Sequence, residues 1–171
     1  MMMETRPLGR SGPRVGVVGI CPGPGPQQAA IAARAKALGC TLVWEGTPPP
    51  GAGVVRYNLL DQKKANEEIS TLARSGKGVL AVHVLAGGAL AGRKDHDYGH
   101  RIEALKVLVK PGRTLAQAAV QFVLANESVS AAMIRVSTVA HLEEVVSAPD
   151  AAPLTGQDLE QIFELWANRF E

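Results

Sequence analysis

The sequence predicts an α/β protein built around a parallel sheet. Two apolar runs at residues 54–60 and 79–85 flank residues 63–74, whose apolar side chains recur at helical spacing. The second run is apolar almost throughout, which is typical of a strand that is covered on both faces of a parallel sheet. These three segments therefore form a βαβ unit, and the alternation of strand and helix patterns along the rest of the chain indicates the same class.

Length and composition favour one soluble domain over residues 1–171, with a core built from small aliphatic side chains. Hydrophobic residues make up 46% of the 171 residues and charged residues 20%, which excludes a disordered protein. Aromatic residues make up only 4%. The net charge of +2 comes from scattered Lys and Arg, so we expect no nucleic-acid partner.

The sequence also indicates a cytoplasmic protein with no membrane partner. No apolar run approaches the roughly 18 residues of a membrane-spanning helix. The segment Met1–Arg6 lacks the apolar centre of a signal peptide. Cys21 and Cys40 are expected to be reduced, as is usual for a protein of that compartment.

The N-terminal part predicts a hairpin, a helix and a strand. Extended runs at residues 4–8 and 14–20 flank the turn-forming residues 9–13, and the second run continues as a buried strand. The Ala-rich residues 27–38 predict a helix that Gly39 ends. Two segments follow it: a second strand at 41–45 and a Pro/Gly linker at 46–53.

The C-terminal part contains two helices with capping signals. Thr114 precedes an apolar periodic segment and has Gln117 three positions later, which predicts a capped helix over 115–125. Thr155, with Asp158 in the following turn, predicts a final amphipathic helix that reaches residue 170. The remaining expected elements are a short helix at 102–109, a strand at 131–136 and a helix at 139–148.

Several motifs carry a family resemblance: RPLGRSG at 6–12 with the strand RVGVVGI after it, RYNLLD at 56–61, LAGGALAG at 85–92, and the segments 114–126 and 133–145. Together and in this order they resemble the aldo-keto reductases, which are NADP(H)-dependent enzymes on a (β/α)8 barrel. The resemblance implies a fold derived from that barrel, with an N-terminal hairpin and a C-terminal helix.

The resemblance also implies a large internal loss. Where the family has its third to fifth strands, this chain has only residues 46–53. The family's catalytic Asp falls at Trp44, and its catalytic Tyr, Lys and His have no counterpart. Because hydride transfer to a carbonyl needs a general acid, we expect no reduction by the family's mechanism.

The positions that would hold NADP(H) are altered as well. The aromatic residue that stacks on the nicotinamide in the family corresponds to Val82, the serine after it to His83, and an amide-bearing residue to Val54. We therefore expect no cofactor. The alternative is a retained phosphate-binding turn, formed by Leu85, Gly87, Gly88, Arg93 and Ser137.

About five βα units can form either a reduced, barrel-like structure or an open parallel sheet. The short linker suggests that the strands at 41–45 and 54–60 are neighbours joined by an extended segment. Otherwise another copy of the chain covers their edges. In either arrangement a sheet edge or apolar surface is poorly covered, so we expect a homodimer.

Candidate site residues lie at the carboxyl ends of the expected strands, where parallel α/β proteins bind ligands. His83 and Glu45 are candidates for acid–base catalysis. Alternatively, His83 is a hydrogen-bonded core residue. The candidates for binding a small, anionic substrate are Trp44, Tyr57, Asn58 and Arg135.

Two of these candidates also have a structural interpretation. Trp44 is expected to be a core residue more often than a ligand platform. Arg135 needs an anionic partner, and a structural carboxylate is the expected one. The spacing of His96 and His100 could suit zinc, but the polar segment around Gly99 favours a loop, and we expect no metal.

Three hypotheses for the function remain. The first is a cofactor-independent enzyme of the cyclase, isomerase or lyase type that uses acid–base groups on a small molecule. The second is a catalytically inactive binding or scaffold protein. The third is a residual NADP(H)-dependent oxidoreductase that oligomerisation completes.

Overall fold

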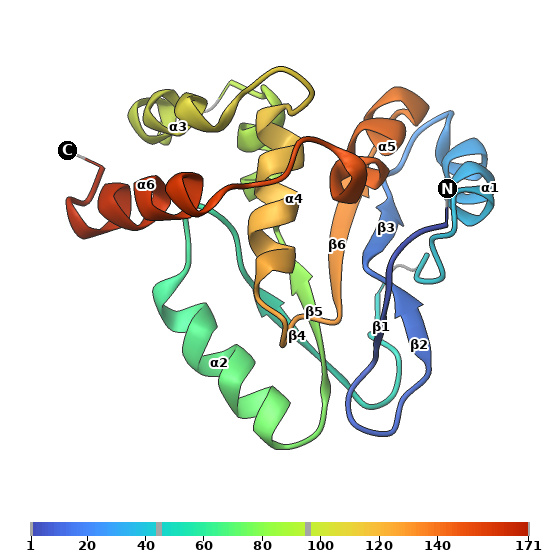
Figure 1. Ribbon diagram of the computed structural model, residues 1–171. Coiled ribbons are helices and arrows are strands. Elements are labelled where there is room, and N and C mark those ends of the chain that lie inside the picture. Colours follow the sequence, from blue (N-terminus) through green and yellow to red (C-terminus); the bar gives the residue numbers. More distant parts are fainter. Residues whose placement is uncertain (1, 44–45, 95–96, 171) are drawn as a thin grey trace.

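The computed structural model describes residues 2–43, 46–94 and 97–170. Its centre is a four-stranded parallel sheet in the order β3-β6-β5-β4 (Figure 1). The strands are β3 (Val18–Pro22), β4 (Ala52–Arg56), β5 (Gly78–Val82) and β6 (Ala131–Val136). The expected α/β class with a parallel sheet is confirmed, together with an N-terminal antiparallel hairpin of β1 (Thr5–Pro7) and β2 (Arg14–Gly16).

The helices of the βα units cover one face of the sheet. They are α1 (Gln28–Ala37), α2 (Lys63–Arg74), α4 (Leu115–Ala125) and α5 (Val139–Val146). Alternate strand residues such as Ile20, Ala81 and Ile134 are buried in the core beneath these helices. The arrangement corresponds to the outer helix layer of a (β/α) barrel, but the strands form an open sheet instead of a closed ring.

The opposite face of the sheet corresponds to the inside of a barrel. Leu80 and Met133 lie on it, in a second apolar cluster with Leu8 and Val15 of the hairpin region. Towards β4 this face is open, since Val54 is 40% exposed. The hairpin therefore covers the amino-terminal end of this face and leaves the carboxyl end accessible.

Helices α3 (Gly99–Leu105) and α6 (Gly156–Ala167) lie beyond α4, on the side away from the hairpin (Figure 1). The short 3₁₀ helices are η1 (Ala86–Ala91), η2 (Lys106–Leu108) and η3 (Ala148–Asp150). The indole of Trp166 on α6 donates a hydrogen bond to the Leu59 carbonyl at 2.8 Å. This bond fastens α6 to the loop after β4.

A buried ion cluster also anchors the start of α6. The Asp158 carboxylate is fully buried and accepts hydrogen bonds from Lys110 at 2.6 Å and Arg113 at 2.9 Å. Burial alone would raise the pKa of Asp158, but the hydrogen bonds from Lys110, the Thr155 backbone and Arg113 outweigh it and hold that pKa well below its usual range. Asp158 is therefore ionised at neutral pH.

Both predicted helix caps are present. The Thr114 hydroxyl accepts from the Gln117 amide at 3.1 Å, and the Gln117 side chain accepts from the Thr114 amide at 2.9 Å. Thr155 and Asp158 form the same reciprocal pair at the start of α6. In each case, at the amino-terminal ends of α4 and α6, side chains accept hydrogen bonds from the N-cap and N3 amides, as a capping box requires.

The expected pairing of the second and third strands is wrong. Val43 forms a single parallel bridge to Ile20 at the β3 edge, whereas β4 pairs with β5 at the opposite edge. Pairing of β6 with both β3 and β5 occupies the centre of the sheet, so the two segments are kept apart. Trp44 and Glu45, at the end of the expected second strand, lie outside the described residues.

The linker therefore joins opposite edges of the sheet. The Gly51 carbonyl accepts from the Gly78 amide at 2.9 Å, which places the end of the linker beside the start of β5. Ala52 and Gly53, expected in the linker, belong to β4. Helices with the length and apolarity needed to cross a bilayer do not occur in the described part of the chain.

Candidate functional site

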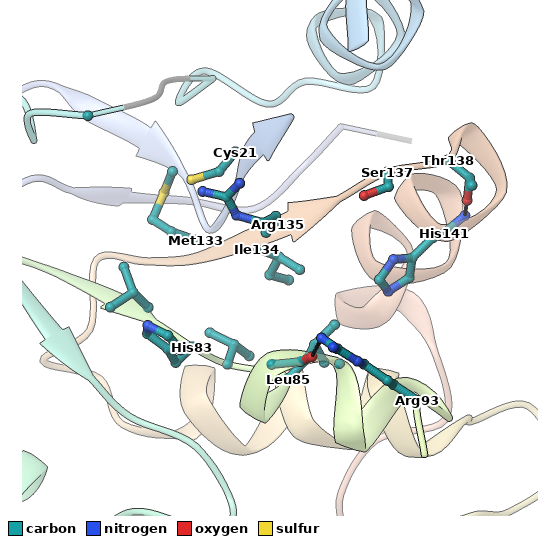
Figure 2. Close-up of a pocket in the computed structure, with 15 residues that line it drawn as sticks. Cys21, His83, Leu85, Arg93, Met133, Ile134, Arg135, Ser137, Thr138 and His141 are labelled. Carbon is teal, nitrogen blue, oxygen red and sulfur yellow. Dashed lines mark hydrogen bonds between the residues drawn. The ribbon is translucent and has the colours of Figure 1, made fainter. Parts of the chain in front are cut away.

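A pocket of about 640 Å³ opens at the carboxyl ends of β3, β5 and β6 (Figure 2). The turn of η1 and the first turn of α5 complete its wall. The described residues that line it are Cys21, Gly46, Val82, His83, Val84, Leu85, Gly87, Gly88, Arg93, Met133, Ile134, Arg135, Ser137, Thr138 and His141. It lies where parallel α/β proteins place their ligands.

Glycines shape the turn that carries Arg93. Gly87 and Gly88 have φ angles of 69° and 96°, which side-chain-bearing residues rarely adopt. A Cβ on Gly88 would also lie 3.4 Å from the Arg93 side chain. The turn folds back so that the Arg93 amide donates to the Gly88 carbonyl at 3.0 Å, and Arg93 Nη1 donates to the Gly87 carbonyl at 3.2 Å.

His83 ends β5 in a strained conformation. Its φ is 56°, in the left-handed region, so the strand stops at Val82 rather than at the expected Leu85. The His83 carbonyl accepts from the Asn58 side chain at 3.0 Å and from the Ala86 amide at 2.8 Å. These two bonds hold the backbone in a conformation that turns the chain from β5 into η1.

The His83 imidazole is an exposed side chain at the pocket, not the core residue of the alternative interpretation. Partial burial lowers its pKa below the ordinary value of 6.5, and the nearby charges of Arg56 and Arg135 lower it further. The ring is therefore neutral at neutral pH and able to accept a proton.

Arg135 lies on the open face of the sheet at the end of β6, opposite Cys21 in the strand register. It is exposed, and it forms no hydrogen bond or ion pair with any residue in the described ranges. The expected structural carboxylate is therefore absent from those ranges. By contrast, Arg113 is paired with Asp158 and Arg34 with Glu143.

The start of α5 contributes an imidazole, while its first amides are largely occupied. The Thr138 hydroxyl accepts from the His141 amide at 3.2 Å, and the Gln27 side chain accepts from the Val139 amide at 3.0 Å. The His141 ring points into the pocket (Figure 2). Its Nε2 atom is buried and has no hydrogen-bond partner among the described residues.

The sequence-predicted site residues are only partly brought together. His83 and Arg135 line the pocket, and so do Leu85, Gly87, Gly88, Arg93 and Ser137. Trp44 and Glu45 lie outside the described residues.

Tyr57 and Asn58 do not reach the pocket. Tyr57 is buried against the Phe122 ring, with 5.3 Å between ring centroids, and burial raises the pKa of its phenol. Asn58 is 1% exposed and holds the backbone of Leu60 and His83. Both residues support the site from behind it.

Two pocket residues, Thr138 and His141, are not among the site residues predicted from the strand ends. Both follow the sixth strand and belong to the next helix, whose first turn bends back over the pocket. The Thr138 capping pattern three residues before His141 was the available signal.

The charged residues in the described lining of the pocket are all basic. Its described lining includes two arginines and two histidines but no aspartate or glutamate. No group of three or more His, Cys, Asp or Glu side chains within the described ranges is placed to hold a metal ion. His100, from the candidate pair of histidines, instead contacts the Phe170 carbonyl, and His96 is outside these ranges.

Comparison with known proteins gives one family. The sequence profile described as "Aldo/keto reductase family" matches residues 34–167. No curated protein matches the chain.

The fold is similar to that of solved structures, among them the apo and holo forms of aldo-keto reductase AKR11C1 from Bacillus halodurans, with TM-scores of 0.57 and 0.56 and sequence identities of 19% and 20%. Each match covers 85% of this chain, and 60% and 59% of those chains respectively. The chain therefore spans about 60% of the length of the reductases that it resembles.

Proposed function

The chain belongs to the aldo/keto reductase family, and from that premise we propose that its pocket binds a small anionic molecule and catalyses proton transfer without a nicotinamide cofactor. The observation that carries the proposal is His83. A neutral imidazole stands at the end of β5 near the Arg135 guanidinium, which has no ion-pair partner among the described residues, in a pocket without a described carboxylate.

The chemistry that suits this arrangement is proton abstraction next to a carbonyl group. Arg135 binds the carboxylate of a 2-oxo acid and places C3, the carbon next to the ketone carbonyl, near His83. The imidazole removes a proton from that carbon, and the electrons of the C–H bond move onto the carbonyl oxygen to form an enolate. Return of the proton to the same or a neighbouring atom completes an exchange or an isomerisation, with no net oxidation.

Two observations support the absence of hydride transfer. Val82 stands where the family has the aromatic ring that stacks on the nicotinamide, and His83 stands where the family has a serine that holds the pyrophosphate. The first amides of α5, which could otherwise bind a phosphate, already donate to Thr138 and Gln27.

Solvent exchange tests the proposal without knowledge of the product. The protein is incubated in D2O with 2-oxo acids, such as oxaloacetate and 2-oxoglutarate, and loss of the signal of the C3 protons, next to the ketone, is followed by ¹H NMR. We expect exchange above the rate of buffer alone, and a loss of at least about tenfold in His83→Gln.

The controls decide between the first two hypotheses. Lys77→Gln, at the opposite end of the sheet, should exchange like the wild type. Binding of a 2-oxo acid with no exchange in any variant would leave an inactive binding protein and overturn the proposed catalysis.

A second candidate, binding of NADP(H), has one observation in its favour. Leu85, Gly87, Gly88, Arg93 and Ser137, the residues expected for a retained phosphate-binding turn, all line the same pocket. Titration with NADPH, followed by its fluorescence, tests this candidate. Micromolar affinity that falls in Arg93→Met would favour it, and no binding up to millimolar concentration would end it.

A further inference from the structure

The basic side chains of the pocket lie at two separate positions along its wall. Arg135 lies at the end of β6, towards Cys21 and the His83 side of the pocket, whereas Arg93 and His141 approach from η1 and α5 (Figure 2). No aspartate or glutamate is among the described lining residues. A ligand with a single anionic group would leave one of the two places without a counter-charge.

His141 is the stronger indication of a second contact. Its Nε2 is the buried side-chain nitrogen without a hydrogen-bond partner in the described part of the chain. Leaving such an atom unsatisfied is unfavourable, and a rotation of the ring towards the pocket would let a ligand oxygen satisfy it. The backbone of His141 is held by the Thr138 hydroxyl, so the ring is kept on this side of the helix.

Arg93 can serve the same ligand group. Its guanidinium has five N–H donors and uses one nitrogen for the Gly87 carbonyl. That contact fixes the arginine in the turn while the other donors remain available to an anion. A carboxylate or phosphate between Arg93 and His141 would therefore receive two hydrogen bonds from different elements.

The lining of the pocket also includes apolar residues: Val82, Val84, Leu85, Met133 and Ile134. An aliphatic segment of a ligand would be buried against these side chains without losing a hydrogen bond.

We infer that the ligand is a small dianion of the dicarboxylate type, in which a short hydrocarbon segment separates two anionic groups. One group binds Arg135, and the other binds Arg93 and His141. This inference rests on the proposed function of the same pocket and narrows the substrate class. The reacting carbon, next to the ketone carbonyl, lies on the Arg135 side of the ligand, near His83.

The test is a chain-length series measured by isothermal titration calorimetry at constant ionic strength. The probes are the α,ω-dicarboxylates from succinate to suberate, each compared with the monocarboxylate of equal carbon number. We expect one length to bind best, and to bind about tenfold or more tightly than its monocarboxylate.

The variants assign the two places. Arg135→Met, Arg93→Met and His141→Phe should each reduce the preference for the dicarboxylate to about twofold or less, while Arg10→Met, at the far end of the sheet, should keep it. His83→Gln should keep it as well, because His83 is assigned to proton transfer. A dicarboxylate preference with no solvent exchange would therefore refute the catalytic proposal alone.

Three results would overturn the inference itself. The first is equal binding of dicarboxylates and monocarboxylates. The second is a preference that survives in both Arg93→Met and His141→Phe. The third is displacement of the best dicarboxylate by adenosine 2′,5′-bisphosphate at a concentration at least tenfold lower, which would assign both cation positions to a nucleotide.

Discussion

At the scale of single residues, His83 combines strain with an unusual electrostatic environment. A residue other than glycine loses roughly 1 kcal/mol or more of conformational free energy in the left-handed region. Hydrogen bonds from the Asn58 side chain and the Ala86 amide to the His83 carbonyl hold His83 in this conformation. Strain of this kind is concentrated at functional sites. Asn58 is therefore important for the placement of His83, although it does not reach the pocket.

The first prediction concerns the pKa of His83. We expect a value below 6.5, since partial burial and the charges of Arg56 and Arg135 all disfavour the imidazolium. Arg56→Gln and Arg135→Gln should each raise it, and Arg74→Gln on α2 should not. The pH dependence of the Cε1–Hε1 signal, assigned by its absence in His83→Gln, measures this. A wild-type pKa at or above 6.5 would contradict it.

The sign of the stability effect follows from the same shift. Because the pKa of His83 is lower in the folded state, the unfolded chain binds the proton more readily. The contribution to stability is complete above pH 6.5 and is lost as the pH falls through the folded-state pKa. The free energy of unfolding should therefore drop more between pH 7.5 and 5 in the wild type than in His83→Gln.

At the scale of elements, the capping box of α4 is a local device with a measurable value. Thr114→Ala removes the acceptor for the Gln117 amide, and we expect a loss of about 1 kcal/mol in the free energy of unfolding. Urea denaturation measures it. Thr71→Ala is the matched control, since Thr71 lies inside α2 and caps no helix end. Equal losses in the two variants would show that the cap contributes nothing.

The ion cluster at α6 should contribute more. Asp158→Asn leaves Arg113, which is 2% exposed, without its counter-charge, and we expect a loss of about 3–5 kcal/mol. Lys110→Met should cost less, because the Lys110 side chain is 43% exposed. Urea denaturation at pH 7 compares the two variants with Glu160→Gln on the same helix.

Acid provides a second measurement on the same cluster. The pKa of Asp158 is depressed on folding, so its contribution is present above the unfolded-state pKa of about 3.8 and is lost as the pH falls below it. Asp158→Asn should flatten the acid limb of the stability profile. An unchanged profile would mean that the cluster does not stabilise α6.

At the scale of the whole molecule, the open β4 edge of the sheet is the feature on which the expected homodimer depends. β4 pairs with β5 on one side and with no described strand on the other. The Tyr57 amide donates to the Val82 carbonyl at 3.2 Å, so alternation along the strand directs the amides of Val54 and Arg56 outwards. An edge with free donors and an exposed valine is a site for pairing with another chain.

We therefore expect a homodimer through the β4 edge. Light scattering coupled to size-exclusion chromatography should give about twice the chain mass of 18.0 kDa. Val54→Lys should shift the protein to the monomer, because a charged side chain on an edge strand opposes pairing. Val109→Lys removes another exposed valine, away from this edge, and should leave the dimer intact. A wild-type mass of 18 kDa would refute the expectation.

The sequence by itself determined the local elements. Residues 63–74 and 131–136 match α2 and β6 in both bounds, and Thr114 begins α4 as predicted. These features depend on periodicity, strand length and capping, which act over a few residues. The family resemblance likewise depends on short motifs in order, and it is confirmed.

Only the tertiary structure decided which strands are neighbours and which side chains share a pocket. Val43 and β4 lie at opposite edges because β6 pairs with both β3 and β5, a choice between distant segments that no local pattern records. Adjacent positions in a strand face opposite sides of the sheet. Arg135 therefore reaches the pocket, while its neighbour Val136 is buried beneath the helices. Likewise Tyr57, directly after the end of β4, packs on Phe122 and does not reach the pocket.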